Sequence, residues 1–404
     1  MHILLIHQAF ASLNEAGGTR HHELARYLAE KGHQITVIAS PVSYLTGKST
    51  SHRIPWVTKH TEHGITILRT YAYPALHRSF LHRLIGFISF MLSSFFVGLQ
   101  IKGVDLVWGT SPPIFQGLTA WFLARLKGAK FLFEVRDLWP DFAIAVGVLH
   151  QPLLIQASRW LERFLYRHAD QMIINSPGFA SHVQACGARQ VALIPNGSDP
   201  RMFDPSLDGL AFRQQYHLEN KFLALYAGAH GLSNDLSVLL EAARLLEGHP
   251  EIAIVLVGDG KDKPILMRRA DELNLKNVHF LPPFPKLEMP AVLAAADACI
   301  AILKPIPLFS TVYPNKVFDY MAAGKPVILA IDGVIRQVIE SVQAGIAVKP
   351  GDAAALAQAI QSLADKPVMG QAMGQRGRQY VEASFDRAVL AEKLEQIFLS
   401  VVRK

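Results

Sequence analysis

Short apolar runs alternate with helical patterns along the whole chain, and this alternation constrains the fold more than any other feature. In the first half, the runs typical of buried strands cover residues 3–7, 34–40, 65–69, 106–109, 130–135, 171–175 and 191–194. Helical patterns lie between most of them. Buried strands joined in this way form a parallel sheet that helices cover.

The alternation restarts after Pro195-Asn196-Gly197. Strand-like runs follow at residues 222–227, 252–257, 278–281, 298–303, 327–330 and 347–348, with helical patterns at 234–246, 263–273, 354–363 and 388–402. A chain of 404 residues is long enough for two domains. We therefore predict an α/β protein with two Rossmann-like, doubly wound domains. They cover residues 1–196 and 197–385, and a C-terminal helix over 386–404 packs back on the first.

Composition restricts the class of protein further. Hydrophobic residues make up 50% of the chain and charged residues 18%, which is enough apolar material for two buried cores. The only cysteines are Cys186 and Cys299, so neither a disulfide framework nor a cysteine-based zinc site is indicated. The opening residues are typical of a first strand and lack the basic region of a signal peptide. We expect a cytoplasmic protein.

Charge is distributed unevenly between the two halves. Residues 1–200 contain 18 Lys and Arg against 11 Asp and Glu, a net +7, whereas the remainder has 22 of each sign. Basic charge favours anionic targets such as phosphates, nucleic acid or an acidic lipid surface. A nucleic-acid partner is the weakest of these, because the chain has no recognisable nucleic-acid module and no dense Lys/Arg tract.

A glycine-rich loop, Ala16-Gly17-Gly18-Thr19-Arg20, follows the first strand and precedes a helix. Glycines here let the backbone approach an anion that the helix N-terminus also attracts. Arg20 could add a charge-assisted hydrogen bond. The pattern differs from the dinucleotide fingerprint, so NAD is not indicated. A flexible loop without a ligand is the alternative.

Two motifs in the second half follow strands in the same way. Val257-Gly258-Asp259-Gly260 would admit a ligand at the end of a strand, although Asp259 could equally cap the next segment. The stretch from Tyr313 to Val327 enters a short helix whose N-terminal amides and Lys316 would meet a diphosphate. Asp319, one turn after Asn315, could accept bonds from ribose hydroxyls or be a solvated helix carboxylate.

Together these motifs resemble those of the family-4 retaining glycosyltransferases. The resemblance covers nearly the whole chain and is greatest to the subgroup that builds bacterial surface polysaccharides (O-antigen, capsule, exopolysaccharide) on a lipid carrier. It depends on the Gly17-Gly18 loop and four further segments: Phe133–Pro140, Ile194–Asp199, Val257–Gly260 and Asn315–Pro326. The family has the GT-B fold of two facing Rossmann-like domains, binds its nucleotide-sugar mainly in the C-terminal domain, and usually needs neither metal nor cofactor.

The resemblance also implies roles for individual residues. Asp137 would orient an acceptor hydroxyl beside Arg136, or be a structural cap, and Lys316 would stabilise the departing diphosphate. Asp319 would hold the ribose. The predicted donor-binding residues are Gly17, Gly18, Arg20, Gly228, Gly258, Asp259, Gly260, Pro283, Phe284, Asn315, Lys316 and Asp319.

Three positions depart from the family pattern. Members often carry two acidic residues eight apart, but Thr311 stands at the first of these positions and Asp319 at the second. The Arg and Lys that often follow the first strand of the second domain are missing after Gly228. Arg136 stands where a histidine is common. These departures leave open a non-catalytic donor-binding or partner subunit.

Two segments of the first half suggest a membrane surface. Residues 82–101 are the most apolar stretch of the chain, and Arg159, Arg163 and Arg167 repeat along one face of a helix over 153–167. We expect them to hold the first domain peripherally at the anionic inner face of the cytoplasmic membrane. A transmembrane helix over 82–101, or plain packing with a solvated arginine face, are the alternatives.

The predicted activity is retaining transfer of a hexose or N-acetylhexosamine from a nucleotide-sugar donor, with uridine as the expected base. The acceptor would be a saccharide linked to polyprenyl diphosphate. A nucleotide-sugar epimerase can share this architecture, but it would need neither an acceptor nor affinity for membranes.

Overall fold

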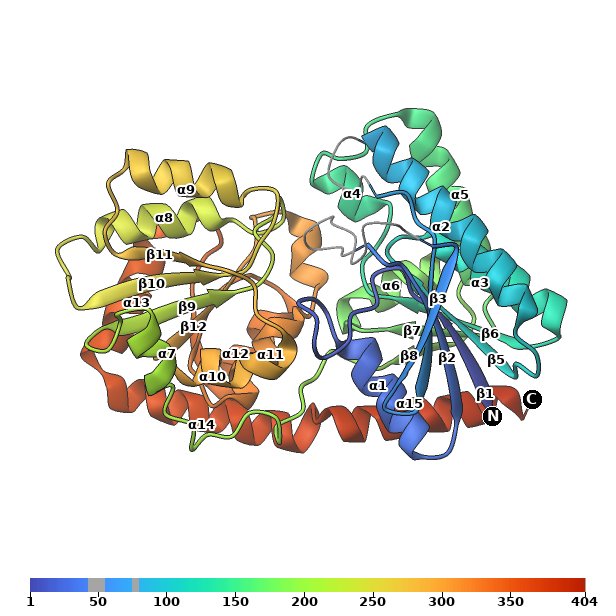
Figure 1. Cartoon of the computed structure of the whole chain (residues 1–404). Coiled ribbons are helices and arrows are strands. Elements are labelled where there is room, and N and C mark those ends of the chain that lie inside the picture. Colours follow the sequence, from blue (N-terminus) through green and yellow to red (C-terminus); the bar gives the residue numbers. More distant parts are fainter. Residues whose placement is uncertain (43–54, 75–79, 404) are drawn as a thin grey trace. The chain divides into compact units, whose positions relative to one another are not determined.

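The structure is a computed structural model that describes residues 1–42, 55–74 and 80–403. The chain forms two compact units (Figure 1). The first contains Met1–Ser12, Gly17–Pro195 and Ala388–Lys404, and the second contains Leu13–Ala16 and Asn196–Arg387. The C-terminal segment therefore belongs to the unit in which the chain begins.

Within the described residues, the first unit has an eight-stranded sheet. Its spatial order is β3 (Val57–Glu62), β4 (Ile65–Thr70), β2 (Gln34–Ala39), β1 (His2–Ile6), β5 (Leu106–Ser111), β6 (Lys130–Val135), β7 (Gln171–Ile174) and β8 (Val191–Leu193). All neighbours pair in parallel except β3, which is antiparallel to β4. The sequence predicts every strand but β3, whose side chains are mostly exposed and polar.

Helices cover both faces of this sheet. They are α1 (Arg20–Glu30), α2 (Phe80–Gln100), α3 (Phe115–Lys127), α4 (Asp141–Ala145), α5 (Pro152–His168), α6 (Ala180–Ala185) and α15 (Arg387–Val402). Figure 1 shows α2, α3 and α5 together on one face. On the other face, α1 and α15 share a core with strand residues, because Leu24 and Phe398 pack in one cluster with Trp108.

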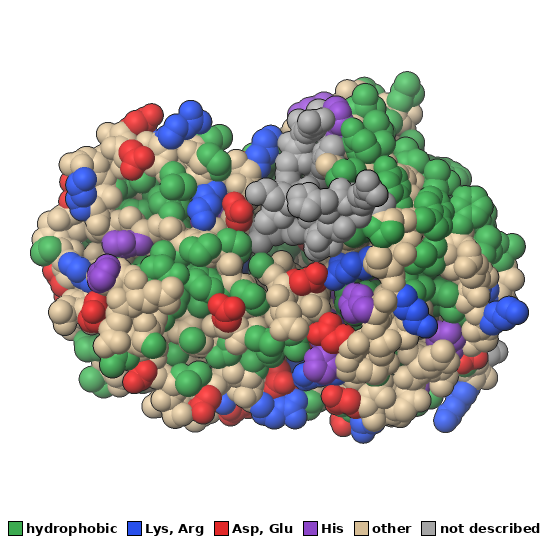
Figure 2. All heavy atoms as spheres, in the orientation of Figure 1, with side chains coloured by type: hydrophobic (Ala, Val, Ile, Leu, Met, Phe, Trp, Pro, Cys, Tyr) green, Lys and Arg blue, Asp and Glu red, His purple; other side chains and the backbone are tan. Residues whose placement is uncertain are grey.

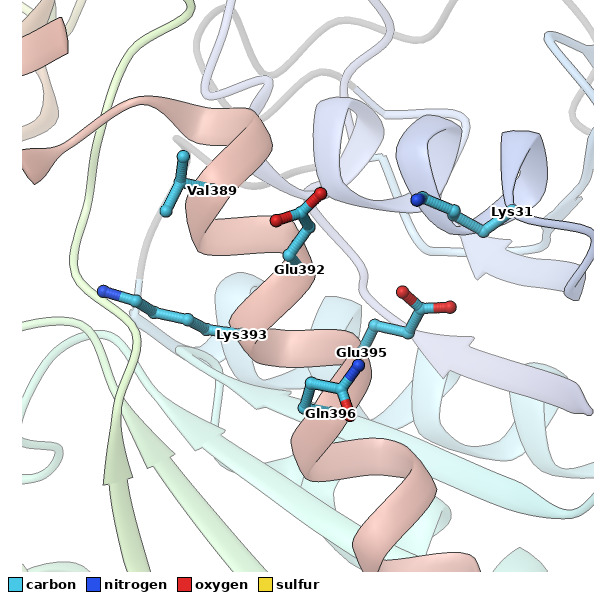
Figure 3. Close-up of a pocket in the computed structure, with 6 residues that line it drawn as sticks. All are labelled: Lys31, Val389, Glu392, Lys393, Glu395 and Gln396. Atoms are coloured by element: carbon cyan, nitrogen blue, oxygen red, sulfur yellow. The ribbon is translucent and has the colours of Figure 1, made fainter. Parts of the chain in front are cut away.

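A hydrogen bond, as well as packing, holds the C-terminal helix α15 in the first unit. His33 lies 2.8 Å from a carboxylate oxygen of Glu395. A surface pocket beside this contact is lined by Lys31 and residues of α15 (Figure 3). Lys31 precedes β2 and so lies near the amino end of that strand, whereas ligands of such sheets bind beyond the carboxyl ends of strands. We therefore assign this pocket to the helix contact.

The second unit has a six-stranded, all-parallel sheet in the order β11 (Val278–Leu281), β10 (Ile252–Val257), β9 (Phe222–Ala227), β12 (Ala298–Ile302), β13 (Val327–Ala330) and β14 (Gly345–Ala347). Its helices are α7 (Leu210–Gln215), α8 (Leu236–Leu245), α9 (Lys263–Glu272), α10 (Met289–Ala294), α11 (Asn315–Ala322), α12 (Val334–Val342), α13 (Ala353–Asp365) and α14 (Pro367–Ser384). The sequence analysis did not predict α14.

Both faces of the second sheet are buried. Side chains alternate along each strand, so Leu225 of β9 enters one core and Tyr226 the other. The first core includes residues of α10, α11, α12 and α14, and the second includes residues of α8, α9 and α13. Each unit thus has a sheet with helices on both faces, wholly parallel in the second unit and parallel except for β3 in the first, as the alternation in the sequence predicts.

Candidate functional site

The second unit has a topological switch point between β9 and β12. Strand order runs outwards from β9 through β10 to β11 on one side, and from β12 through β13 to β14 on the other. Loops that leave such a switch point diverge and open a crevice beyond the carboxyl ends of the strands. The glycine motifs that follow β9 and β10 lie at this edge.

These two glycine loops are in backbone contact. Gly228 has φ +152° and Gly258 has φ +143°, a region that L side chains rarely adopt. A Cβ at Gly258 would overlap the carbonyl oxygen of Gly228, and a Cβ at Gly228 would lie 2.6 Å from the ammonium nitrogen of Lys316. Only glycine permits this approach, and it keeps a path open to Lys316.

Further hydrogen bonds fix the loop after β10. The amide of His230 donates to the carbonyl of Asp259 at 2.8 Å, and the Asp259 carboxylate accepts from the amide of Gly260. Lys263, on the first turn of α9, donates to the carbonyls of Gly258 and Leu281, each at 2.7 Å. Asp259 therefore shapes the loop, and Lys263 joins the ends of β10 and β11.

Lys316 is in the first turn of the short helix α11 and lies over an aromatic ring. Its ammonium nitrogen is 3.9 Å from the centroid of Tyr226, whose hydroxyl donates to the carbonyl of Ala229 at 2.7 Å. Burial lowers the pKa of Lys316 to about 7. A diphosphate beside the ammonium would restore its charged form, so the site is suited to an anionic ligand.

His230 is a second titratable group in the same place. It is 0% exposed, and its ring nitrogens have no hydrogen-bond partner within the described ranges. Burial, followed by the charges of Lys263 and Lys316, lowers the pKa of His230 to about 4. The imidazole is therefore neutral at pH 7 and retains both a donor and an acceptor nitrogen.

Asp319 is held by partners from three segments. Ser198 donates its hydroxyl to one carboxylate oxygen at 2.7 Å, and Lys286 lies 2.6 Å from the other. The side-chain amide of Asn315 also donates to this second oxygen, at 3.2 Å. Because both oxygens already accept bonds, Asp319 anchors α11 to its surroundings. Its predicted bonds to ribose stay a prediction.

The other predicted residues of the second unit lie around the same edge. Pro283 and Phe284 follow β11, and the Phe284 ring packs against Phe212 with centroids 5.9 Å apart. Asn315 also accepts a bond from Arg387 at 3.2 Å. Thr311 donates its hydroxyl to the carbonyl of Leu308 at 2.7 Å and is thus occupied locally.

The first unit has its own switch point, between β1 and β5, and polar side chains gather there. His7 follows β1 and lies 3.2 Å from the hydroxyl of Thr110 on β5. Burial, followed by the neighbouring His21 and Arg136, lowers the pKa of His7 well below its ordinary value. The rings of His7 and His21 are in contact, with centroids 4.3 Å apart and planes tilted by 56°. Burial likewise lowers the pKa of His21 to about 4, so both imidazoles are neutral at pH 7.

Glu134, the buried carboxylate of β6, organises this region. It accepts bonds from Arg20 at 2.9 Å, from His21 at 2.8 Å and from the Trp108 indole at 3.0 Å. Burial opposes ionisation, but the charge of Arg20 and the hydrogen bond from His21 outweigh it and hold the pKa of Glu134 well below its ordinary range.

This arrangement changes the interpretation of Arg20. Its guanidinium also donates to the carbonyl oxygens of Ile194 and Pro195, and the residue is only 5% exposed. The side chain is committed to Glu134 and the end of the sheet, and its predicted phosphate contact stays a prediction. The sequence motif identified the loop correctly but could not reveal a partner 114 residues away.

Arg136 and Asp137 follow β6 directly. Arg136 donates to the carbonyls of Ser111 and Pro112 at 3.2 and 3.3 Å, so it joins the ends of β5 and β6. Burial raises the pKa of Asp137 to about 6, and the charge of Arg136 opposes this shift. A carboxylate with such a pKa can accept a proton or a hydrogen bond near neutral pH.

The Gly17-Gly18 loop precedes α1 in the first unit. Gly17 has φ +155°, whereas nothing lies within 4 Å of the position that a Cβ would occupy on Gly18. The loop is therefore open at Gly18. Its predicted approach to donor phosphates stays a prediction.

Several residues of these two regions were not singled out from the sequence. His7, His21 and Glu134 lie on or beside ordinary strand and helix patterns, and neither Lys263 nor Lys286 belongs to a recognisable motif. One signal was available: a glutamate inside the apolar run at 130–135 requires a buried partner. The excess of histidine in the first half is consistent with the cluster around that glutamate.

Comparisons with known proteins agree with this architecture. Residues 16–197 match the glycosyl transferase 4-like domain, and residues 210–380 match the glycosyl transferases group 1. The Escherichia coli K12 protein named as the colanic acid biosynthesis glycosyl transferase WcaI is 28% identical over 314 residues. That alignment covers 75% of this chain and 76% of WcaI.

Solved structures share the fold over the whole chain. Sucrose-phosphate synthase from Thermosynechococcus elongatus has a TM-score of 0.76 at 21% identity, with 99% of this chain and 98% of that chain covered. Anabaena HepE in complex with UDP and glucose has a TM-score of 0.73 at 18% identity, with 98% and 99% covered. Two parallel-sheet units of this kind constitute the GT-B fold. The chain therefore belongs to the group 1 glycosyl transferases with a 4-like N-terminal domain, and it is a GT-B glycosyltransferase.

Proposed function

We propose that this enzyme transfers a hexose or N-acetylhexosamine, with retention, from a UDP-sugar to a lipid-linked saccharide. One observation carries the donor half of the proposal. Lys316 and His230 lie at the switch point of the second unit, beside the glycine loops of Gly228 and Gly258. The printed description of HepE, a complex with UDP and glucose, supports a uridine nucleotide as the donor.

The donor site would act mainly on the leaving group. Negative charge accumulates on the diphosphate as the glycosidic bond to it breaks, and a fixed cation stabilises that charge. Lys316 supplies a cation with few competing contacts, whereas Lys263 is held by the carbonyls of Gly258 and Leu281. Retention would follow from attack by the acceptor on the same face that the diphosphate leaves, within an ion pair.

The acceptor would meet the polar group of the first unit. Burial raises the pKa of Asp137 to about 6. It is Arg136, rather than Asp137, that joins the ends of β5 and β6. Its carboxylate would accept a hydrogen bond from the acceptor hydroxyl and orient it for attack. Arg136 would keep Asp137 in place through the two carbonyls at the end of β5.

An anionic membrane surface would supply the lipid-linked acceptor. One face of α2 bears exposed apolar side chains at helical spacing, which we call the apolar stripe. Its members are Leu81, Ile85, Ile88, Leu92, Phe96 and Leu99. Figure 2 shows hydrophobic side chains gathered over this part of the first unit. Leu84 and Phe87 of α2 line a pocket with Leu154 and Ser158 of α5, so the two helices are neighbours.

Charge on α5 favours the same surface. Arg159, Arg163 and Arg167 are exposed there, beside Leu153 and Trp160, which are 80% and 65% exposed. An apolar stripe flanked by arginines is typical of helices that lie in the interface of anionic lipids. The enzyme would thus be peripheral on the inner face of the cytoplasmic membrane.

Spanning is the less favourable arrangement for α2. By length and composition it is the one helix among the described residues that could cross a bilayer, over Leu81–Gln100. Its other face is packed against the sheet, however. Phe90 is fully buried, and Ser93 donates to the carbonyl of Tyr71 at 2.6 Å. Insertion across a bilayer would break these contacts.

A thermal-shift panel of nucleoside diphosphates and nucleotide-sugars, with NAD as the control, tests the donor assignment. A ligand at 100 times its Kd stabilises the native state by about 2.7 kcal/mol. We expect the uridine series alone to raise Tm. Transfer assays with synthetic polyprenyl-diphosphate saccharides then test the acceptor. Release of an epimerised nucleotide-sugar without any acceptor, or no nucleotide response at saturation, would overturn the proposal.

A further inference from the structure

Three side chains with metal-binding chemistry meet in the first unit, apart from the residues assigned above. They are His22 on α1, Glu62 at the end of β3 and His63 in the turn to β4, and their ligand atoms all lie within 4.8 Å of one another. The Nε2 of His22 is 3.8 Å from one carboxylate oxygen of Glu62, and the Nε2 of His63 is 3.7 Å from the other.

The burial of His22 points to a ligand. The side chain is 0% exposed, it lies against the ring of Phe10 with centroids 5.8 Å apart, and neither ring nitrogen has a hydrogen-bond partner within the described ranges. A buried polar group without a partner loses its hydration without compensation. A metal ion on Nε2 would supply the missing interaction.

The spacing of the three groups suits a metal better than hydrogen bonds. The separations of 3.7 and 3.8 Å are too long for hydrogen bonds. Ligands about 2.0–2.1 Å from a tetrahedral zinc ion lie roughly 3.3 Å from one another. The rings of His22 and His63 are nearly perpendicular, with centroids 5.7 Å apart, so both nitrogens can face one point. Side-chain movements of a few tenths of an ångström would complete the geometry.

The other cluster of metal-binding side chains in the described part of the chain differs in this respect. Glu162 and His182 are hydrogen-bonded at 2.7 Å, and the sulfur of Cys186 lies 3.6 Å from the same imidazole nitrogen. These groups satisfy one another, so no buried atom there requires an ion. The cluster around His22 is therefore the stronger candidate.

We propose that His22, Glu62 and His63 bind one divalent transition-metal ion, Zn²⁺ or a metal of similar preference. Two imidazoles and a carboxylate are ligands that zinc accepts readily, and water would take the remaining position. The nearby cation Arg26 lies 3.6 Å from Glu30, which offsets its charge. The ion would fasten the start of α1 to the β3–β4 hairpin, which otherwise forms an edge of the sheet.

Zinc titration of the metal-free full chain tests the site, with Cys186→Ser as the parent so that the second cluster does not contribute. We expect one zinc ion per chain and a rise in Tm on its addition. His63→Asn removes a ligand at an exposed position and keeps a residue that tolerates φ +49°. It should weaken zinc binding by more than about tenfold, the loss that removing an outer-shell partner alone can cause.

His60→Asn is the matched control, because His60 is an exposed histidine on the same strand and outside the cluster. It should bind zinc as the parent does. Glu62→Gln provides an independent variant that leaves the buried His22 untouched. Equal zinc affinity in His63→Asn and His60→Asn would place the metal elsewhere. A parent that neither binds zinc at micromolar concentration nor gains stability from it would also overturn the proposal.

Discussion

The ammonium nitrogen of Lys316 lies 3.9 Å from the centre of the Tyr226 ring, on the side where Gly228 carries no side chain. A cation over an aromatic ring is stabilised without being neutralised, so its charge stays available to a ligand. The hydroxyl of Tyr226 is engaged by the carbonyl of Ala229. The ring is therefore fixed, and Lys316 is held at the mouth of the glycine loops.

Replacing Lys316 with alanine should weaken binding of a nucleoside diphosphate by about 1–3 kcal/mol, the scale of a lost charge-assisted hydrogen bond. Isothermal titration of UDP measures this directly. Lys276→Ala is the control, because Lys276 is an exposed lysine of the same unit that lies outside the site. Unchanged UDP affinity in Lys316→Ala would remove Lys316 from the donor site.

The pH dependence of nucleotide affinity provides a second test of Lys316. Burial lowers its pKa to about 7, so the side chain loses its proton as pH rises above 7 and must regain one to pair with a diphosphate. UDP affinity should therefore fall between pH 7.5 and 9.5, by up to about tenfold per pH unit. Lys316→Arg keeps its charge throughout and should flatten the curve. A wild-type affinity that is constant across this range would contradict the assignment.

Asp137→Asn should lower transfer by about 10²-fold or more while donor affinity stays unchanged. Because burial raises the pKa of Asp137 to about 6, the carboxylate form is gained as pH rises through 6. The wild-type rate should rise over that interval, and the variant should lose this limb of its pH profile. Asp141→Asn, in the helix that follows, is the control. Equal rates for Asp137→Asn and wild type would show that Asp137 is only a structural cap.

Placing a charge in the apolar stripe should release the enzyme from membranes. Phe96 is 52% exposed on α2, so Phe96→Glu costs little packing but repels anionic lipid. In a flotation assay with anionic liposomes we expect the wild type to float and Phe96→Glu to remain in solution. Leu210→Glu, at an equally exposed leucine of the second unit, should float. If Phe96→Glu floats as well, the stripe does not contact lipid.

The fold was predictable wherever burial alone decides structure. The bounds of β9, β10 and β13 match the predicted runs, because strands buried on both faces have uninterrupted apolar sequences. The pattern fails at β3, an edge strand whose sequence VTKHTE has little apolar content to mark it. Pairing with β4 stabilises that strand, and a one-dimensional pattern does not contain that information.

The local structure around the candidate site was predictable where backbone geometry requires glycine, as at Gly258, and where a cation stands in the first turn of a helix, as at Lys316. It was less so where a charge could be used in two ways. Arginine in a glycine-rich loop is typical of anion binding, yet Arg20 forms a buried ion pair with Glu134. Asp319 likewise meets Lys286, 33 residues earlier in the chain. Which charges pair internally depends on tertiary contacts between distant segments.

The return of α15 to the first unit has a consequence for recombination between relatives. Leu390, Leu394 and Phe398 complete a core that begins with Ile3 and Leu5. The first unit is therefore encoded by two stretches of sequence that flank the stretch encoding most of the second. A chimaera that exchanges donor-binding units has to replace residues 196–387 as an internal cassette. A single crossover after Pro195 would instead give the first unit the terminal helix of another protein. The side chains of that helix would then fit poorly into the core of the first unit.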